Sequence, residues 1–91
     1  MSVSVRVPTI LRAYTGGAAE VAAEPGTLRE VLADLDASYP GLGGRILDDA
    51  GQLRRFVNVY VNNEDIRYLE ELATPVSASD EVSIIPAVAG G

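Results

Sequence analysis

The chain has 91 residues, with thirteen acidic residues against seven arginines, a net charge of −6, and no lysine, histidine, cysteine or tryptophan. This length predicts one small domain with a single hydrophobic core. The missing residue types exclude a disulfide framework, a cysteine or histidine zinc site, a thiol nucleophile, a Ser-His-Asp triad and a lysine-containing phosphate loop. The negative charge disfavours nucleic-acid binding, because the phosphate backbone attracts clustered cations.

The sequence carries no signal for a membrane or for secretion. It contains no run of about 18 apolar residues, which is the length needed to span a bilayer. It also has no basic-then-apolar leader. We therefore expect a cytoplasmic protein that has no membrane partner.

The first part of the chain predicts a hairpin with a long connection. Residues 2–7 alternate between apolar and polar side chains, which is typical of a half-buried strand. Residues 15–17 form a turn, and residues 18–24 give a weaker second strand. Between the strands, Ile10 and Leu11 are expected to keep the chain close to the core.

The clearest helix signal lies at residues 28–38. Thr27 and Glu30 have the capping-box spacing, in which two side chains satisfy two backbone donors at the start of a helix. Apolar residues then recur at helical spacing and form one stripe, made of Leu28, Val31, Leu32, Leu35 and Tyr39. A proline and a glycine end the helix. The stretch 41–55 is predicted to be an irregular connection with one helical turn.

The second half of the chain predicts two strong strands and one short strand. Residues 56–61 alternate valines with larger side chains, residues 62–65 supply turn residues, and residues 66–68 return as a short strand. A tight turn then places Leu72 beneath the sheet. Residues 82–86 form the final strand, with alternate apolar residues in the core.

This order of elements predicts an α+β fold of the β-grasp, ubiquitin-like type. A mixed sheet of four to five strands would pack on one main helix, because a single amphipathic helix must bury its stripe against one face of a sheet. A ferredoxin-like fold needs a second long helix, which the sequence lacks. We expect residues 1–86 to form the domain and residues 87–91 to form a flexible tail that ends in two glycines.

The tail is the run Ala87-Val88-Ala89-Gly90-Gly91. Glycine lacks a Cβ and reaches both positive and negative φ, so this end could pass through a channel too narrow for other residues. The Gly91 carboxylate would then be the only reactive group of the tail. The two glycines alone leave open a frayed terminus or an extension added by cloning.

Several segments carry a resemblance to a known family. They are Pro8-Thr9-Ile10-Leu11-Arg12, Thr15-Gly16-Gly17, Phe56-Val57-Asn58-Val59-Tyr60-Val61-Asn62, Glu64-Asp65-Ile66-Arg67 and Pro86-Ala87-Val88-Ala89-Gly90-Gly91. With these motifs the chain resembles the CysO-type branch of the MoaD/ThiS family of sulfur carriers. The ending is common to the wider family, whereas the two internal regions favour the branch that serves cysteine biosynthesis.

The resemblance implies a carrier cycle in which partner enzymes do the chemistry. An adenylating enzyme of the ubiquitin-activating kind would use ATP and Mg²⁺ to activate the Gly91 carboxylate, and sulfur would replace AMP to give a thiocarboxylate. A pyridoxal-phosphate (PLP) dependent cysteine synthase would receive the sulfur, and a zinc metallopeptidase of the JAMM class would release the cysteine. This chain would then be a carrier with no catalytic residue and no bound cofactor or metal. It would be a monomer when free.

The site residues that we expect are the tail and one outer sheet surface. Gly91 would carry the sulfur, and Ala87, Val88, Ala89 and Gly90 would thread into the partner. Phe56, Tyr60 and Ile85 are expected to be exposed on adjacent strands and to dock partners.

Three alternatives remain open at this point. The first is a MoaD-like or ThiS-like carrier that serves molybdopterin or thiamin synthesis. The second is a ubiquitin-like modifier that is conjugated to lysines of other proteins. The third is a plain binding module whose tail is inert.

Overall fold

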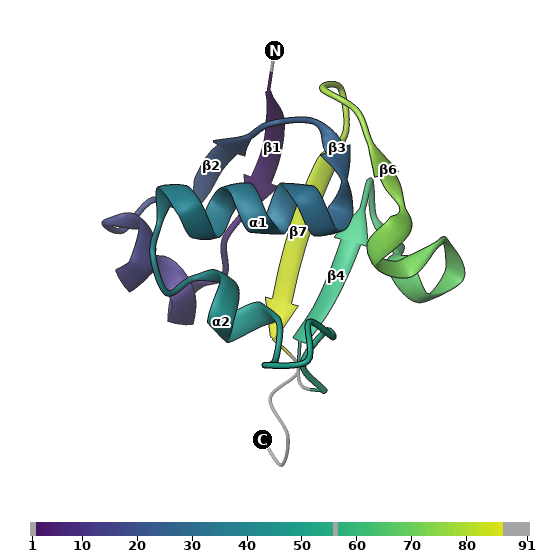
Figure 1. Ribbon diagram of the computed structural model, residues 1–91. Coiled ribbons are helices and arrows are strands. Elements are labelled where there is room, and N and C mark those ends of the chain that lie inside the picture. Colours follow the sequence, from purple (N-terminus) through teal and green to yellow (C-terminus); the bar gives the residue numbers. More distant parts are fainter. Residues whose placement is uncertain (1, 56, 87–91) are drawn as a thin grey trace.

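The computed structural model describes residues 2–55 and 57–86, and residues 1, 56 and 87–91 lie outside what it describes. Its centre is a five-stranded mixed sheet with one long helix across one face (Figure 1). The strands, in spatial order, are β2 (Glu20–Ala23), β1 (Val3–Arg6), β7 (Glu81–Pro86), β4 (Val57–Val61) and β5 (Glu64–Asp65). This arrangement is the predicted β-grasp fold.

The last strand of the chain lies in the middle of the sheet. β7 pairs with β1 in parallel and with β4 in antiparallel orientation. The hairpin of β1 and β2 is antiparallel, as is the pair of β4 and β5. The parallel first and last strands confirm the prediction, and the pairing places β7 between β1 and β4.

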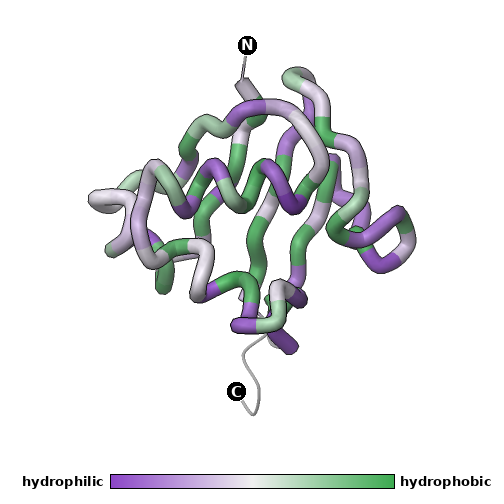
Figure 2. The backbone as a smooth tube through the Cα atoms, in the orientation of Figure 1, coloured by the Kyte–Doolittle hydropathy of each residue, from purple (hydrophilic) through white to green (hydrophobic). Residues whose placement is uncertain are grey.

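The helix α1 (Leu28–Ser38) begins as the sequence predicts. The Glu30 backbone N–H donates to Thr27 Oγ1 at 3.3 Å, and the Thr27 N–H donates to Glu30 Oε1 at 2.8 Å, which completes the capping box. The apolar stripe faces the sheet, with Leu28, Val31, Leu32 and Leu35 all buried. Figure 2 shows hydrophobic residues recurring along the strands beneath this helix. Burial of each such side chain contributes about 1.5–3 kcal/mol.

The connection between β1 and β2 contains a 3₁₀ helix, η1 (Thr9–Thr15). Leu11 is buried as predicted, but Ile10 is 67% exposed, so its predicted place near the core is wrong. In a 3₁₀ helix successive side chains point about 120° apart. Neighbouring residues such as these two therefore cannot both face the core. The turn that follows uses Gly16 and Gly17 at φ 68° and 93°, conformations that favour glycine.

The connection after α1 contains a single helical turn, α2 (Gly43–Ile46), as predicted. Asp36 holds it in place, because its Oδ1 accepts from the N–H groups of Gly41 and Gly43 at 3.2 and 3.0 Å. Ile46 is buried in the core.

The return strand after β4 differs from the prediction. β5 is Glu64–Asp65, and residues 66–68, predicted as a strand, form the 3₁₀ helix η2 (Ile66–Tyr68). The reason is the turn: Asn62 and Asn63 both have positive φ, 51° and 70°, and they reverse the chain in two residues. The observed turn is therefore two residues shorter than the predicted turn at residues 62–65.

Two further short strands were not predicted. β3 (Gly26–Thr27) pairs antiparallel with β6 (Pro75–Val76), just before α1 begins. Two residues are too few to show an alternation. The 3₁₀ helix η3 (Glu71–Ala73) precedes β6 and buries Leu72, which confirms the predicted place of that side chain. No helix within the described ranges is both long and apolar enough to cross a membrane.

Candidate functional site

The tail leaves the domain from its central strand. Pro86, the last described residue, lies opposite Val57 at the end of the β4–β7 pair. β4 and β7 pair along the whole of β4, as far as Val61 opposite Val82. Val82 and Ile84 are buried on the helix side of the sheet. The root of the tail is therefore held by β4 on one side and by the core beneath it, because β1 pairs with β7 only at residues 81–83.

The predicted tail residues themselves lie outside the described part of the chain. These are Gly91, the predicted point of sulfur attachment, and Ala87, Val88, Ala89 and Gly90, the predicted threading residues. Their roles stay predictions.

Two of the predicted docking residues, Tyr60 and Ile85, fall on the outer face of β4 and β7. Ile85 is 47% exposed and lies opposite Asn58, while Tyr60 lies opposite Ser83. Tyr60 and Ile85 are thus diagonal neighbours on one face. Tyr60 is half-buried, less exposed than we predicted. Phe56 lies outside the described residues, and docking by this surface stays a prediction.

Four polar residues that the sequence analysis did not name as docking residues form a row with Tyr60 across the same face. The register aligns five positions from one sheet edge to the other, namely Glu20, Arg6, Ser83, Tyr60 and Asp65. A shallow cavity of about 360 Å³ lies on this face, lined in part by Arg6, Ser83, Ile85 and Pro86. The outer face next to the tail root therefore combines one apolar side chain with an arginine and a hydroxyl.

The edge of this face is fixed by Arg67. Its Nη2 donates to Asp65 Oδ2 at 2.8 Å and to Asn58 Oδ1 at 2.9 Å, so it reaches from η2 across to β4. The side-chain hydrogen bond from Arg67 is the largest cause of the lowered pKa of Asp65, and the same bond raises the pKa of Arg67. An exposed ion pair adds little stability. Its main effect here is to hold the guanidinium in one position.

The described residues contain no cluster of acidic side chains that could serve as a metal site. Across residues 2–55 and 57–86, no three acidic side chains come together in a way that could hold a metal ion. The predicted reactive group remains the Gly91 carboxylate, at the end of a five-residue run that begins directly after β7.

Comparisons with known proteins agree with this architecture. The sulfur carrier protein CysO of Mycobacterium tuberculosis is 50% identical over 93 residues, with 100% of both chains covered. A chain of the Amycolatopsis orientalis BexX/CysO complex superposes with a TM-score of 0.91 at 43% identity, covering 98% of this chain and 99% of that chain. The small archaeal modifier protein 1 of Methanosarcina acetivorans gives a TM-score of 0.85 at 31% identity, covering 99% and 96%.

The family model agrees with these relatives. The ThiS family model matches residues 5–91, which include most of the sheet and the whole tail. The resemblance that the sequence motifs indicated is confirmed, and the chain belongs to the ThiS family.

Proposed function

We propose that this protein is a sulfur carrier that bears a thiocarboxylate on Gly91. The observation that carries the proposal is the path of the chain: an uncharged run ending in Gly90-Gly91 follows directly from the central strand β7. Membership of the ThiS family and 50% identity to a sulfur carrier protein support the role. The domain acts as a rigid base, and the tail brings its carboxylate into partner enzymes.

The chemistry needs an activated carboxylate. At neutral pH the terminal carboxylate is charged and is a poor electrophile for a sulfur nucleophile. An adenylating enzyme with ATP and Mg²⁺ would form the acyl-adenylate and release pyrophosphate. Sulfide would then attack the acyl carbon, forming the C–S bond while AMP leaves. ATP and Mg²⁺ belong to that enzyme, and this chain is its co-substrate.

The composition supports a carrier that reacts only at its end. Without cysteine, the protein has no internal thiol to capture the activated acyl group. Without lysine, it has no side-chain amine that could attack the acyl-adenylate of its own tail. Sulfur carried by this chain would therefore be located at Gly91.

We propose cysteine biosynthesis as the destination of the sulfur, because the closely similar relatives named above are CysO proteins. The receiving enzyme would be a PLP-dependent cysteine synthase, and a JAMM-class zinc peptidase would release the product, all in the cytoplasm. Carriage for molybdopterin or thiamin synthesis is the alternative within the family.

A second candidate function is protein modification. Its support is the likeness to the small archaeal modifier protein 1, at 31% identity and a TM-score of 0.85. A modifier would use the same activated tail but would transfer it to a lysine amine of a target protein.

Intact-protein mass spectrometry tests these functions. The purified protein is incubated with the adenylating enzyme of its source organism, ATP, Mg²⁺ and sulfide. We expect an oxygen-to-sulfur mass increase on the C-terminal peptide, and no increase on a variant that lacks Gly91. Absence of the increase in the intact chain would falsify sulfur carriage. The same measurement on protein purified from the native host separates the branches, because an additional mass of one cysteine residue on the tail supports cysteine biosynthesis. Covalent conjugates to other proteins that survive boiling in reducing agent would instead support protein modification.

A further inference from the structure

A cavity lined by arginines lies beside the root of the tail. It has a volume of about 220 Å³, and three of the seven arginines of the chain line it, Arg54, Arg55 and Arg67. Val57 lines it as well, and Val57 is the strand partner of Pro86. Among the described lining residues the acidic side chain is Glu71. In a protein of net charge −6, three arginines are therefore gathered at the end from which the tail departs, and one of them, Arg67, pairs with Asp65.

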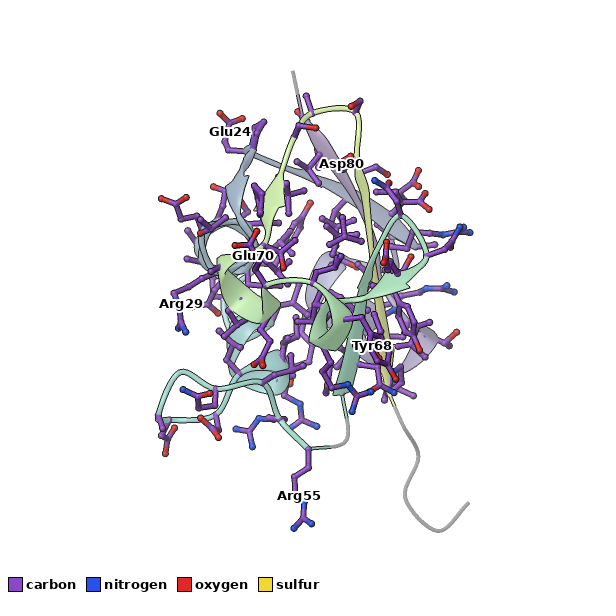
Figure 3. All side chains as sticks on the ribbon, turned by 90° about the vertical axis from the view of Figure 1, so that its right-hand side faces the viewer. Glu24, Arg29, Arg55, Tyr68, Glu70 and Asp80 are labelled. Carbon is purple, nitrogen blue, oxygen red and sulfur yellow. The ribbon has the colours of Figure 1, made fainter. Side chains whose placement is uncertain are left out.

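The opposite end of β4 has the opposite charge. A second cavity of about 540 Å³ is lined by Val61 of β4 and by Glu64, Glu70 and Asp80, with no arginine among its described lining residues. Figure 3 shows Arg55 at one end of the molecule and Glu24 and Asp80 at the other. The two cavities at the ends of β4 thus differ in charge, because arginines line the one at the tail end and acidic residues line the one at the far end.

Two of the three arginines of the first cavity, Arg54 and Arg67, are held in defined positions. Arg54 Nε donates to the Gly44 carbonyl oxygen at 2.8 Å, and the Arg54 backbone N–H donates to the Ile46 carbonyl oxygen at 2.9 Å, which ties Arg54 to α2. Arg67 is held by its bonds to Asp65 and Asn58. Fixed guanidinium groups lose less conformational entropy when they bind carboxylates. Two members of the cluster, Arg54 and Arg67, are therefore already held in place before a partner binds.

We propose that Arg54, Arg55 and Arg67 form a docking surface for carboxylate side chains around the entrance of the partner channel that takes up the tail. An acidic partner repels a domain of charge −6 in most orientations, but it attracts this end of the domain. The charge difference between the two cavities therefore turns the carrier so that its tail approaches first, which raises the association rate. The inference rests on the proposed function in one respect, which is that the tail enters a partner.

Matched arginine substitutions test this surface. Arg29 on α1 is the control, because it is exposed like Arg54 and its Nη1 likewise donates to a backbone carbonyl, that of Gly51 at 2.9 Å. The association rate with the adenylating enzyme is measured by stopped-flow at low and high salt for Arg54→Ala, Arg54→Lys and Arg29→Ala. We expect Arg54→Ala to slow association about threefold or more at low salt, with the difference lost at high salt because salt screens exposed charges. Arg54→Lys and Arg29→Ala should keep the rate of the unsubstituted protein.

Two results would overturn the docking surface. One is an equal loss in Arg54→Ala and Arg29→Ala, which would report net charge alone. The other is an unchanged rate in Arg54→Ala when circular dichroism shows a folded variant. The rates are measured without sulfur transfer, so they judge the docking surface separately. The mass increase on the unsubstituted protein judges sulfur carriage.

Discussion

Asn62 and Asp80 join the β4–β5 turn to the start of β7. Asn62 Nδ2 donates to Asp80 Oδ1 at 2.8 Å, and Asn62 Oδ1 accepts from the Glu81 backbone N–H at 2.9 Å. The Asn62 N–H in turn donates to the Glu81 carbonyl oxygen at 2.8 Å. The tail departs from one end of β7, and this side chain fastens the other end.

The two asparagines of the turn allow this fastening to be measured. Asn62 and Asn63 both have positive φ, but the Asn63 side chain makes no hydrogen bond to any described residue. We expect Asn62→Gly to lower the free energy of unfolding by about 1–2 kcal/mol, because glycine keeps the backbone conformation and removes only the side-chain bonds. Asn63→Gly should change it by less than about 0.5 kcal/mol. Urea denaturation measures both, and equal losses would show that the bonds of Asn62 contribute nothing.

Asp80 should make part of the stability depend on pH. The backbone hydrogen bond from Ser77 is the largest cause of its lowered pKa, followed by the bond from Asn62. A carboxyl group whose pKa is lower in the folded state stabilises the protein above its unfolded pKa of about 3.9. That contribution is lost as the pH falls through the folded pKa.

The check is urea denaturation of the unsubstituted protein and Asp80→Asn at pH 7 and at pH 3. We expect the stability difference between them to be larger at pH 7. The control is Asp49→Asn, since the Asp49 carboxylate accepts no hydrogen bond within the described part of the chain. The difference in stability between Asp49→Asn and the unsubstituted protein should be small at both pH values. A difference for Asp80→Asn that does not change with pH would contradict the argument.

Secondary structure could be predicted from the sequence where an element is long enough to show a periodic pattern. The helix α1 was predicted with its bounds because a capping box and a repeated apolar spacing coincide there. Prediction failed for two-residue elements such as β3 and β5, which are set by tertiary pairing and by turn geometry. It also failed for Ile10, since a 3₁₀ connection has no clear pattern.

Only part of the candidate site could be predicted from the sequence. The Gly-Gly ending consists of neighbouring residues, so the sequence shows it directly. The arginine cavity could not be predicted, because β4, η2 and the connection after α2 bring its members together from distant positions. The bond between Arg67 and Asn58 likewise spans nine positions and depends on the two-residue turn.

Tyr60 is expected to contribute to the binding of the adenylating enzyme. It is a half-buried aromatic residue on the outer face of β4, diagonally next to the exposed Ile85 on β7. Tyr60→Ala should weaken binding about tenfold or more if the ring packs against the partner. The control is Tyr68→Ala, because Tyr68 is 82% exposed and belongs to η2 rather than to β4 or β7. A binding titration compares the two variants, and an equal affinity for both would exclude a role for Tyr60 in docking.

The narrowest prediction concerns the last two residues. Gly90→Val and deletion of Gly91 should each abolish formation of the thiocarboxylate, because a channel shaped for glycine excludes a branched side chain and because the shortened tail no longer reaches the reacting atoms. The tail already contains a valine at position 88, so the restriction should apply only to the last two residues.

Ala87→Val is the matched control and should keep the oxygen-to-sulfur mass increase. All three variants should unfold at the temperature of the unsubstituted protein, since the substitutions follow the last strand. Sulfur loading of Gly90→Val at the rate of Ala87→Val would show that the diglycine does not set the fit.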